Sequence, residues 1–541
     1  MEEPKKQNYL RGVAILGSTA ILVKVIGAIY KLPLYNILDN EGAAHFQVAY
    51  QVYTMLLAIS LSGIPVALSR LVAAARATGD AGGVKRYFSV SLPAFATVGL
   101  AFALAMFFKS DSLARAMGDV HAAAGLRALA PGVFFCCVIS VYEGYSQGHG
   151  NMTPTALKQI IEVLCKLAAG LTIAWLLLRA GYASPYVAAG AISGASIGLA
   201  AALPVLMALK RRIDRSETYP ASGAASAAAS GRGATLARIF KVSVPITLGA
   251  SFMSIMTVID TKLVLWRLER SAGYSAEQAQ ALYGAYAKGQ PFLQLPSALI
   301  VPFTLSIIPA ISAAAASGRS GDAREVMASS LKLTCLVAMP AGAGITVLAR
   351  PIFGALLGQS GVGADVLAIF GLASFFICMQ LLTTAFLQAN GHERVPAVTY
   401  PIGGLIQIAL DWVLVGDPRV GILGSPFGTL ACYLSITLMN LAVIARRVKN
   451  RPRFAAAFLR PALCTAVMGA AAYSVYNLLE RALTSVLGHY GRMETLICLC
   501  AAVAVGAAVY LTLVLLTGAI TRDDLKSMPR GGRLADILRL K

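Results

Sequence analysis

Long apolar runs, each of about 20 residues, follow one another along almost the whole chain. A helix of about 20 apolar residues is what the hydrocarbon core of a bilayer requires. Fourteen such runs fall at residues 11–34, 45–70, 88–108, 127–147, 155–178, 185–209, 240–266, 282–312, 330–350, 364–388, 396–416, 421–444, 458–479 and 494–518. The pattern therefore predicts an all-α polytopic membrane protein with about 14 transmembrane helices.

The first run is apolar but carries two lysines, Lys24 and Lys31. Their spacing is about two helical turns, so both side chains lie on one face. Small residues lie on or beside that face: Gly17, Ala20, Gly27 and Ala28. A lysine inside the bilayer usually faces a protein interior or a wet cavity, which predicts a helix that lines a path for an anion. The alternative, strongest for Lys31 beside Pro33, is that the side chain snorkels to the membrane interface.

The eighth run is rich in proline, which removes helical hydrogen bonds and kinks or breaks helices. We therefore expect this segment to be broken or kinked at Pro291, Pro296, Pro302 and Pro309. Such a break can serve as a gate, or it can be a kink that packing alone requires.

Composition and charge fit this topology. The chain is 57% hydrophobic and only 13% charged, and its formal net charge is +21. The basic residues concentrate in alternate connections, at residues 5–11, 70–86, 210–241, 319–332, 446–460 and 522–541. Cytoplasmic loops carry this excess of lysine and arginine, so both termini should be cytoplasmic. The positive charge thus indicates membrane orientation, and we expect no nucleic-acid partner.

Similar segments recur on the two sides of an Ala/Ser/Gly-rich linker at residues 216–234. Gly79-Asp80-Ala81 matches Gly321-Asp322-Ala323, and the turn at Gln147 matches the turn at Gln388, at offsets of 241–242 residues. A six-span unit keeps both copies in one orientation, which predicts two parallel lobes. The expected organisation is a six-helix lobe at 1–215, a cytoplasmic linker at 216–238, a second six-helix lobe at 239–447, two additional helices at 448–520 and a cytoplasmic tail at 521–541.

Further polar residues lie within the predicted spans. If the lysines share one cavity, it is cationic and suits a phosphate or pyrophosphate, which lysine binds as a point charge. The candidates for this central cavity are Lys24, Lys31, Gln51, Lys262, Lys288 and Gln290. Three carboxylates are candidates for ion coupling: Glu143, Asp260 and Asp411. Lys158, Glu162 and Lys166 share a helix face at i, i+4 and i+8, so this trio can be purely structural.

The sequence contains no motif of an enzyme. It lacks the nucleotide-binding pattern GxxxxGK[ST] and the hydrolytic patterns HExxH and GxSxG. We therefore expect no catalytic residues, no metal site and no cofactor. An ion gradient, of Na⁺ or H⁺ for example, remains open as the energy source.

Several segments resemble the stage V sporulation protein B family, within the multidrug/oligosaccharidyl-lipid/polysaccharide (MOP) exporter superfamily. They are residues 12–34, Glu41-Gly42, Ala49-Tyr50, 63–70, Gln294-Leu-Pro296 and 306–312. The resemblance implies a MATE-like fold of fourteen helices that rocks between inward- and outward-facing states. In the related lipid II flippases, basic residues on spans one, two and eight line the cavity. Lys24 matches the first of these, Lys288 lies near the third, and Gln51 departs from the second.

We therefore expect a flippase that moves a lipid-linked cell-wall precursor, such as lipid II, in peptidoglycan assembly during sporulation. Its expected partners are an oligosaccharide lipid of the undecaprenyl pyrophosphate type, membrane lipids and the wall-synthesis machinery. The main alternative is a cation-coupled multidrug antiporter of the same fold, which would use unpaired carboxylates. A third reading, a membrane scaffold that transports nothing, leaves the charges within the spans without a role.

Overall fold

The computed structural model describes residues 29–61, 63–216, 231–316, 320–358, 361–448, 454–487 and 491–518, with residues 19, 22–23 and 26–27 of the first run. Lys24, the greater part of the linker and the tail lie outside the described residues. Within the described part the chain forms helices joined by short turns, and no strand is present. Eleven helical segments there are long and apolar enough to cross a membrane. The prediction of an all-α, multi-pass membrane protein is confirmed.

The chain divides into two compact units. Unit 1 comprises Met1–Trp266 and Ser275–Gly284, and unit 2 comprises Arg267–Tyr274 and Ala285–Lys541. The long helix α10 after the linker thus belongs mostly to unit 1, whereas the sequence placed it in the second lobe. The predicted division into two six-helix lobes stays a prediction.

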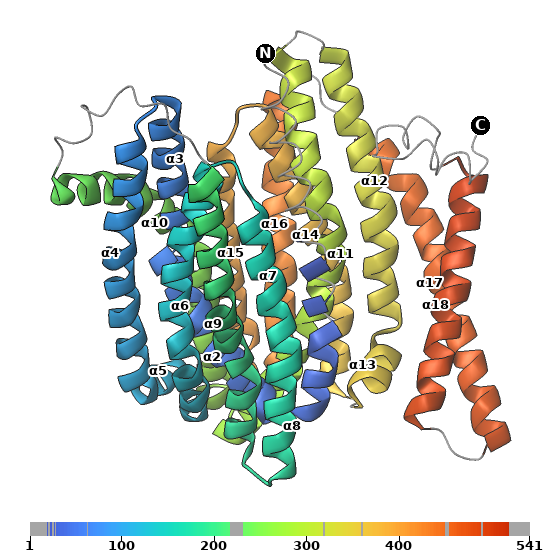
Figure 1. Cartoon of the computed structure of the whole chain (residues 1–541). Helices are drawn as coiled ribbons and strands as arrows, with labels where there is room; N and C mark the ends of the chain where they lie inside the picture. Colours follow the sequence, from blue (N-terminus) through green and yellow to red (C-terminus); the bar gives the residue numbers. More distant parts are fainter. Residues whose placement is uncertain are drawn as a thin grey trace. The chain divides into compact units, whose positions relative to one another are not determined.

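The helices of unit 1 are built from the second to seventh apolar runs (Figure 1). They are α2 (Asn40–Leu61), α3 (Ile64–Ala77), α4 (Ala81–Phe108), α5 (Ser110–Met117), η1 (Val120–Ala122), α6 (Ala123–Gly148), α7 (Thr153–Cys165), η2 (Lys166–Gly170), α8 (Leu171–Arg179), α9 (Ser184–Ser216) and most of α10 (Arg232–Arg270). Their apolar faces meet in a core made chiefly by α3, α4, α6 and α9.

Unit 2 contains most of α11 and the helices that follow it. They are α11 (Ala276–Ala316), α12 (Ser320–Val347), α13 (Ala349–Leu357), α14 (Val362–Ala389), α15 (Arg394–Leu414), η3 (Gly421–Leu423), α16 (Gly424–Arg447), α17 (Phe454–Leu487) and α18 (Arg492–Leu516). Helix bounds in this half follow those of unit 1 at a spacing of about 240 residues, as with α4 and α12, α5 and α13, and α6 and α14. This spacing is consistent with the predicted internal repeat, and both the repeat and a parallel two-fold relation between its copies stay predictions.

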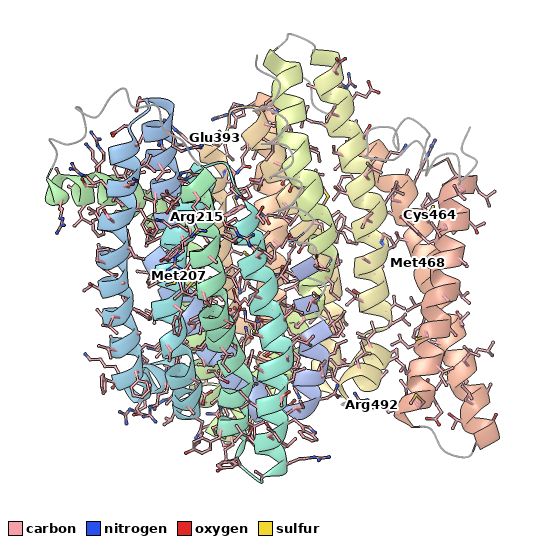
Figure 2. All side chains as sticks on the ribbon, viewed as in Figure 1. Met207, Arg215, Glu393, Cys464, Met468 and Arg492 are labelled. Atoms are coloured by element: carbon pink, nitrogen blue, oxygen red, sulfur yellow. The ribbon has the colours of Figure 1, made fainter. Side chains whose placement is uncertain are left out.

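The last two helices pack on the side of α12 and α13 within unit 2. Cys464 and Met468 of α17, both labelled in Figure 2, join Leu336 of α12 and Tyr510 of α18 in a small buried cluster. The Tyr510 hydroxyl donates a hydrogen bond to the carbonyl of Leu336, at 2.8 Å. Arg492, also labelled there, donates to two carbonyls at the end of α13, at 2.8 and 2.7 Å. These contacts attach the pair of helices outside the repeat.

The second apolar run is interrupted, although the sequence indicated one continuous segment. Helix α3 carries a proline in its first turn, where Pro65 follows Gly63. Proline is tolerated at a helix start but interrupts a helix interior, which explains why α2 ends and α3 begins here. The Gly63 N–H donates to the Thr247 hydroxyl of α10, at 3.1 Å. A Cβ at Gly63 would overlap the Ser243 carbonyl, so α10 lies directly against the interruption.

The eighth run, in contrast, is a continuous helix, so it is not broken at its prolines, and the alternative expectation of a kink stays a prediction. Helix α11 extends over 41 residues through all four prolines. Hydroxyl groups that follow two of these prolines bond to helix carbonyls. Ser297 donates to Gln294 at 2.8 Å and Thr304 donates to Val301 at 2.7 Å. Proline is tolerated in a membrane helix where neighbouring helices, side chains or local adjustment satisfy the freed backbone groups.

Candidate functional site

A cavity of about 190 Å³ lies inside unit 1. Four segments that are distant in the sequence meet around it: the first apolar run, α2, the α7–η2 helix and α9. Its walls are formed by Val23, Gly27, Tyr30, Lys31, Phe46, Tyr50, Gln159, Glu162, Val163, Lys166, Ile192 and Ala195. The cavity thus combines an apolar lining with a few converging polar groups, as ligand sites generally do.

Glu162 of α7 and Lys166 of η2 form a charged part of the cavity wall, and Lys158 of α7 pairs with Glu162 from outside that wall. The Glu162 carboxylate accepts a hydrogen bond from Lys166 at 2.7 Å and lies 3.4 Å from the Lys158 ammonium. The three side chains are between 16% and 20% exposed, and those of Glu162 and Lys166 line the cavity. The ion pairs predicted from the i, i+4 and i+8 spacing are therefore confirmed.

Lys31 faces the same cavity from the first run. Its half-buried ammonium repels that of Lys166, and among the described residues no carboxylate forms an ion pair with it. The neighbouring Tyr30 donates a hydrogen bond to the carbonyl of Ala191 in α9, at 3.3 Å, which fixes this part of the first run against the bundle. Two ammonium groups thus converge on one internal space, as expected for Lys31 if it faces a cavity.

Aromatic rings of α2 form the wall beside the charges. The Lys166 ammonium lies 5.8 Å from the centre of the Tyr50 ring, which is a cation–π distance. Phe46 stacks on Tyr50 with ring centres 6.1 Å apart. These rings hold the lysine in place without neutralising its charge.

Helix η2 is a π-helical turn in the middle of the fifth predicted span, and it begins at Lys166. Its backbone packs tightly on α9, since a Cβ at Gly194 would lie 2.8 Å from the Cα of Gly170. Single π-turns within α-helices are rare and occur often at functional sites. This turn changes the helical register directly after the lysine that lines the cavity.

Glu143 of α6 belongs to the same group of charges as Lys158 and Glu162 but does not line the cavity. Its side chain is only 8% exposed, and it interacts electrostatically with Lys158 and Glu162. Around the cavity there are consequently three ammonium groups, of Lys31, Lys158 and Lys166, and two carboxylates. These three ammonium groups and two carboxylates together carry a net positive charge.

The other predicted site residues of unit 1 lie elsewhere. Gln51 follows Tyr50 in α2 and is half-buried, but it does not belong to the cavity wall. In α10, Asp260 is half-buried and Lys262 is exposed. Lys24 lies outside the described residues.

In unit 2, Lys288 and Gln290 both belong to α11. Lys288 is completely buried and Gln290 is half-buried. Asp411 of α15 is also completely buried, and its carboxylate lies against Gly428 of α16, where a Cβ would overlap it. All three residues belong to unit 2.

At the repeat position in unit 2 the charged trio is replaced by a neutral network. Tyr400 stands 242 residues after Lys158. Its hydroxyl bonds to Gln380 and, at 3.1 Å, to Thr384 of α14. Asn440 of α16 donates to Thr384 at 3.3 Å and accepts from Thr399 at 3.0 Å. In the part of unit 2 that the structure describes, this position thus carries a neutral network where unit 1 carries charges.

Sequence reasoning singled out Lys31 but did not place Lys166, Tyr50 and Gln159 in the same site. The i, i+4 and i+8 pattern was a usable signal for the trio, because charges in an apolar run require partners. For the aromatic and amide members no local pattern exists. Their role depends on contact between four segments that the chain brings together.

Solved structures share the fold of this bundle of membrane helices. A lipid II flippase MurJ in an inward closed conformation matches 93% of this chain and 98% of its own, with a TM-score of 0.67 and 16% identity. An inward-facing multidrug resistance MATE family transporter of the MOP superfamily matches 80% of this chain and 98% of its own, with a TM-score of 0.64 and 17% identity.

The chain belongs to the polysaccharide biosynthesis protein family, whose model matches residues 9–315. Three proteins of Bacillus subtilis (strain 168) are similar over nearly their full lengths. The uncharacterized membrane protein YabM is 27% identical, covering 99% of this chain and 97% of its own. Stage V sporulation protein B is 25% identical, covering 98% and 99%. Lipid II flippase MurJ is 22% identical, covering 93% and 94%.

Proposed function

We propose that the protein is a flippase that moves a lipid-linked cell-wall precursor across the cytoplasmic membrane by alternating access. The substrate class is an oligosaccharide lipid of the undecaprenyl pyrophosphate type, such as lipid II, used in peptidoglycan synthesis during sporulation. The observation that carries the proposal is the convergence of Lys31 and Lys166 on one cavity inside the helical bundle. Both termini are cytoplasmic in this proposal, and the wall-synthesis machinery is the partner.

The chemistry of the cavity supports an anionic ligand. A lysine within a membrane span is costly unless it has a function or a partner, and Lys31 forms no ion pair among the described residues. A phosphate group would supply the missing negative charge, because lysine binds phosphate as a point charge. The cavity, of about 190 Å³, is smaller than a typical pocket for a drug-sized molecule. It suits the charged group alone, while sugars and lipid chain lie outside it.

The relatives agree with this reading. One of them is named a lipid II flippase and another a sporulation protein, and both match almost the whole chain. Lys24, Gln51, Lys262, Lys288 and Gln290 remain proposed substrate contacts of the wider transport path. Glu143, Asp260 and Asp411 remain proposed coupling carboxylates, for Na⁺ or H⁺.

The alternative of a drug antiporter requires a carboxylate that is available to a cation. In the wall of the described cavity the carboxylate is that of Glu162, and it lies between two lysines. A cationic drug would have to displace both ammonium groups and would also be repelled by Lys31. The cavity therefore favours an anion over a cation.

Replacement of Lys31 tests the proposal in cells that depend on this protein for flipping. A charge-assisted contact contributes roughly 1.5–3 kcal/mol, which corresponds to about a tenfold to hundredfold loss of headgroup affinity. We expect Lys31→Ala to impair growth and Lys31→Arg to support it, with membrane levels checked by blotting. Lys210→Ala, which removes a lysine of α9 outside the cavity wall, is the control. Full complementation by Lys31→Glu at normal levels would refute the proposal.

A further inference from the structure

Glu162 occupies the position that an incoming anion needs. One oxygen of its carboxylate lies 2.7 Å from the Lys166 ammonium, and the other lies 3.4 Å from that of Lys158. Both lysines are one helical turn away, on opposite sides, so the carboxylate can favour either of them by a small side-chain movement. An anion that approaches Lys166 from the cavity is therefore repelled by the Glu162 carboxylate, which already pairs with that lysine.

Binding of an anion would also remove an existing repulsion. Lys31 and Lys166 face one cavity and repel each other. An anion placed between them would attract both ammonium groups, whereas Glu162, held on α7, interacts with Lys158 and Lys166. The Glu162 carboxylate, once displaced from Lys166, can pair with Lys158 instead. It therefore does not remain an unpaired charge within the membrane.

We propose that Glu162 is an internal counter-ion, which neutralises Lys166 while the cavity is empty and moves toward Lys158 when an anionic group binds. The inference rests on the proposed function and adds a mechanism for reversible binding to it. Without Glu162 the two lysines of the cavity wall, Lys31 and Lys166, would hold a phosphate group tightly. With Glu162 present, its carboxylate can return to Lys166 and neutralise that lysine, so the bound phosphate group can dissociate.

The mechanism also defines the ligand class. A singly charged carboxylate gains little by displacing another carboxylate, whereas a diphosphate carries more charge and contacts two lysines at once. The site should therefore select a diphosphate group over a carboxylate. This group can come from a polyprenyl diphosphate lipid or from free pyrophosphate, so both sources belong in the test.

Two variants of the trio give opposite expectations. Glu162→Gln removes the internal competitor, so the dissociation constant for the diphosphate should fall about tenfold. Lys158→Met removes the second partner of Glu162 and leaves the carboxylate on Lys166, so the dissociation constant should rise several-fold. A merely structural role of the trio would weaken binding in both variants. Asp214→Asn, which breaks the i, i+4 pair of Lys210 and Asp214 on α9, is the matched control for a general change of charge.

The experiment measures binding of a polyprenyl diphosphate, inorganic pyrophosphate and acetate to the purified full chain in detergent. We expect tighter binding of the polyprenyl diphosphate by Glu162→Gln, weaker binding by Lys158→Met, and no change in Asp214→Asn. Equal or weaker binding by Glu162→Gln, while Lys31→Ala still loses affinity, would overturn the counter-ion role and leave the proposed function intact. Binding of pyrophosphate but not of the lipid would instead overturn the proposed function. If Glu162→Gln cannot be purified folded, the charge-balanced double variant Glu162→Gln/Lys158→Met decides: it should bind the diphosphate more tightly than Lys158→Met, and equal or weaker binding would overturn the counter-ion role.

Discussion

At the scale of single residues, buried charges in unit 1 occur in groups with defined partners. The trio of Lys158, Glu162 and Lys166 is one such group. A second is formed by His45 of α2 and Asp119, which precedes η1. Their side chains lie 2.8 Å apart and are 2% and 0% exposed. Asp119 also accepts a hydrogen bond from the His121 N–H, at 3.1 Å, which stabilises the turn before α6. Removal of one partner leaves the other buried and without its hydrogen bond.

The pair of His45 and Asp119 should therefore be important for stability. Removal of one member of a buried pair costs about 3 kcal/mol, whereas an exposed pair contributes about 0–1 kcal/mol. We expect Asp119→Ala to lower the melting temperature of the purified protein clearly. Asp111→Ala, which breaks an exposed ion pair with Arg127, should leave it almost unchanged. Equal effects of the two substitutions would show that burial of the His45–Asp119 pair has no energetic consequence.

At the scale of helices, close backbone packing explains features that side-chain chemistry does not. The α2–α3 interruption touches α10 at Gly63, and the π-helical turn η2 touches α9 at Gly170. In both places glycine is required by the approach of another backbone. Small residues allow membrane helices to approach closely, which is their main means of association without a hydrophobic driving force.

A side chain at Gly63 should separate α10 from the interruption. Its Cβ would lie 2.1 Å from the Ser243 carbonyl oxygen, so the backbone of α10 would have to move. Overpacking of this kind costs about 1–3 kcal/mol. We expect Gly63→Ala to reduce thermal stability in detergent. Gly233→Ala, at a helical position of α10 with open space around it, should be neutral or stabilising. A stable Gly63→Ala variant would contradict the described contact.

The sequence predicted the helices well because an apolar run of sufficient length is almost a complete description of a membrane helix. It also predicted the ion pairs of Glu162, since they depend only on spacing within one helix. It did not predict the π-turn at Lys166, which accompanies the tight contact of Gly170 with Gly194. It did not predict the cavity either, because Lys31, Tyr50 and Lys166 meet only through tertiary packing. It did not predict the continuity of α11 through its prolines, because a membrane helix can continue where its surroundings satisfy the freed backbone groups.

At the scale of the whole molecule, the two halves have diverged in charge. The unit 1 copy carries the lysines and carboxylates around a cavity, while the equivalent helices of unit 2 carry a hydrogen-bonded network of Gln380, Thr384, Tyr400 and Asn440. A single charged site suffices to bind one anionic group. We infer that unit 1 recognises the headgroup during transport.

Flipping in reconstituted vesicles tests this account most directly. The protein is placed in liposomes with a fluorescent lipid-linked oligosaccharide diphosphate, and the lipid exposed on the outer face is measured over time with an impermeant quencher. We predict movement by the wild-type protein and by Lys31→Arg, and a loss of about tenfold or more in the Lys31→Ala/Lys166→Ala variant, because both cationic contacts are removed. Lys210→Ala should behave as wild type. Undiminished flipping by the double variant, folded and inserted at the wild-type level, would contradict the central claim that this cavity binds the diphosphate.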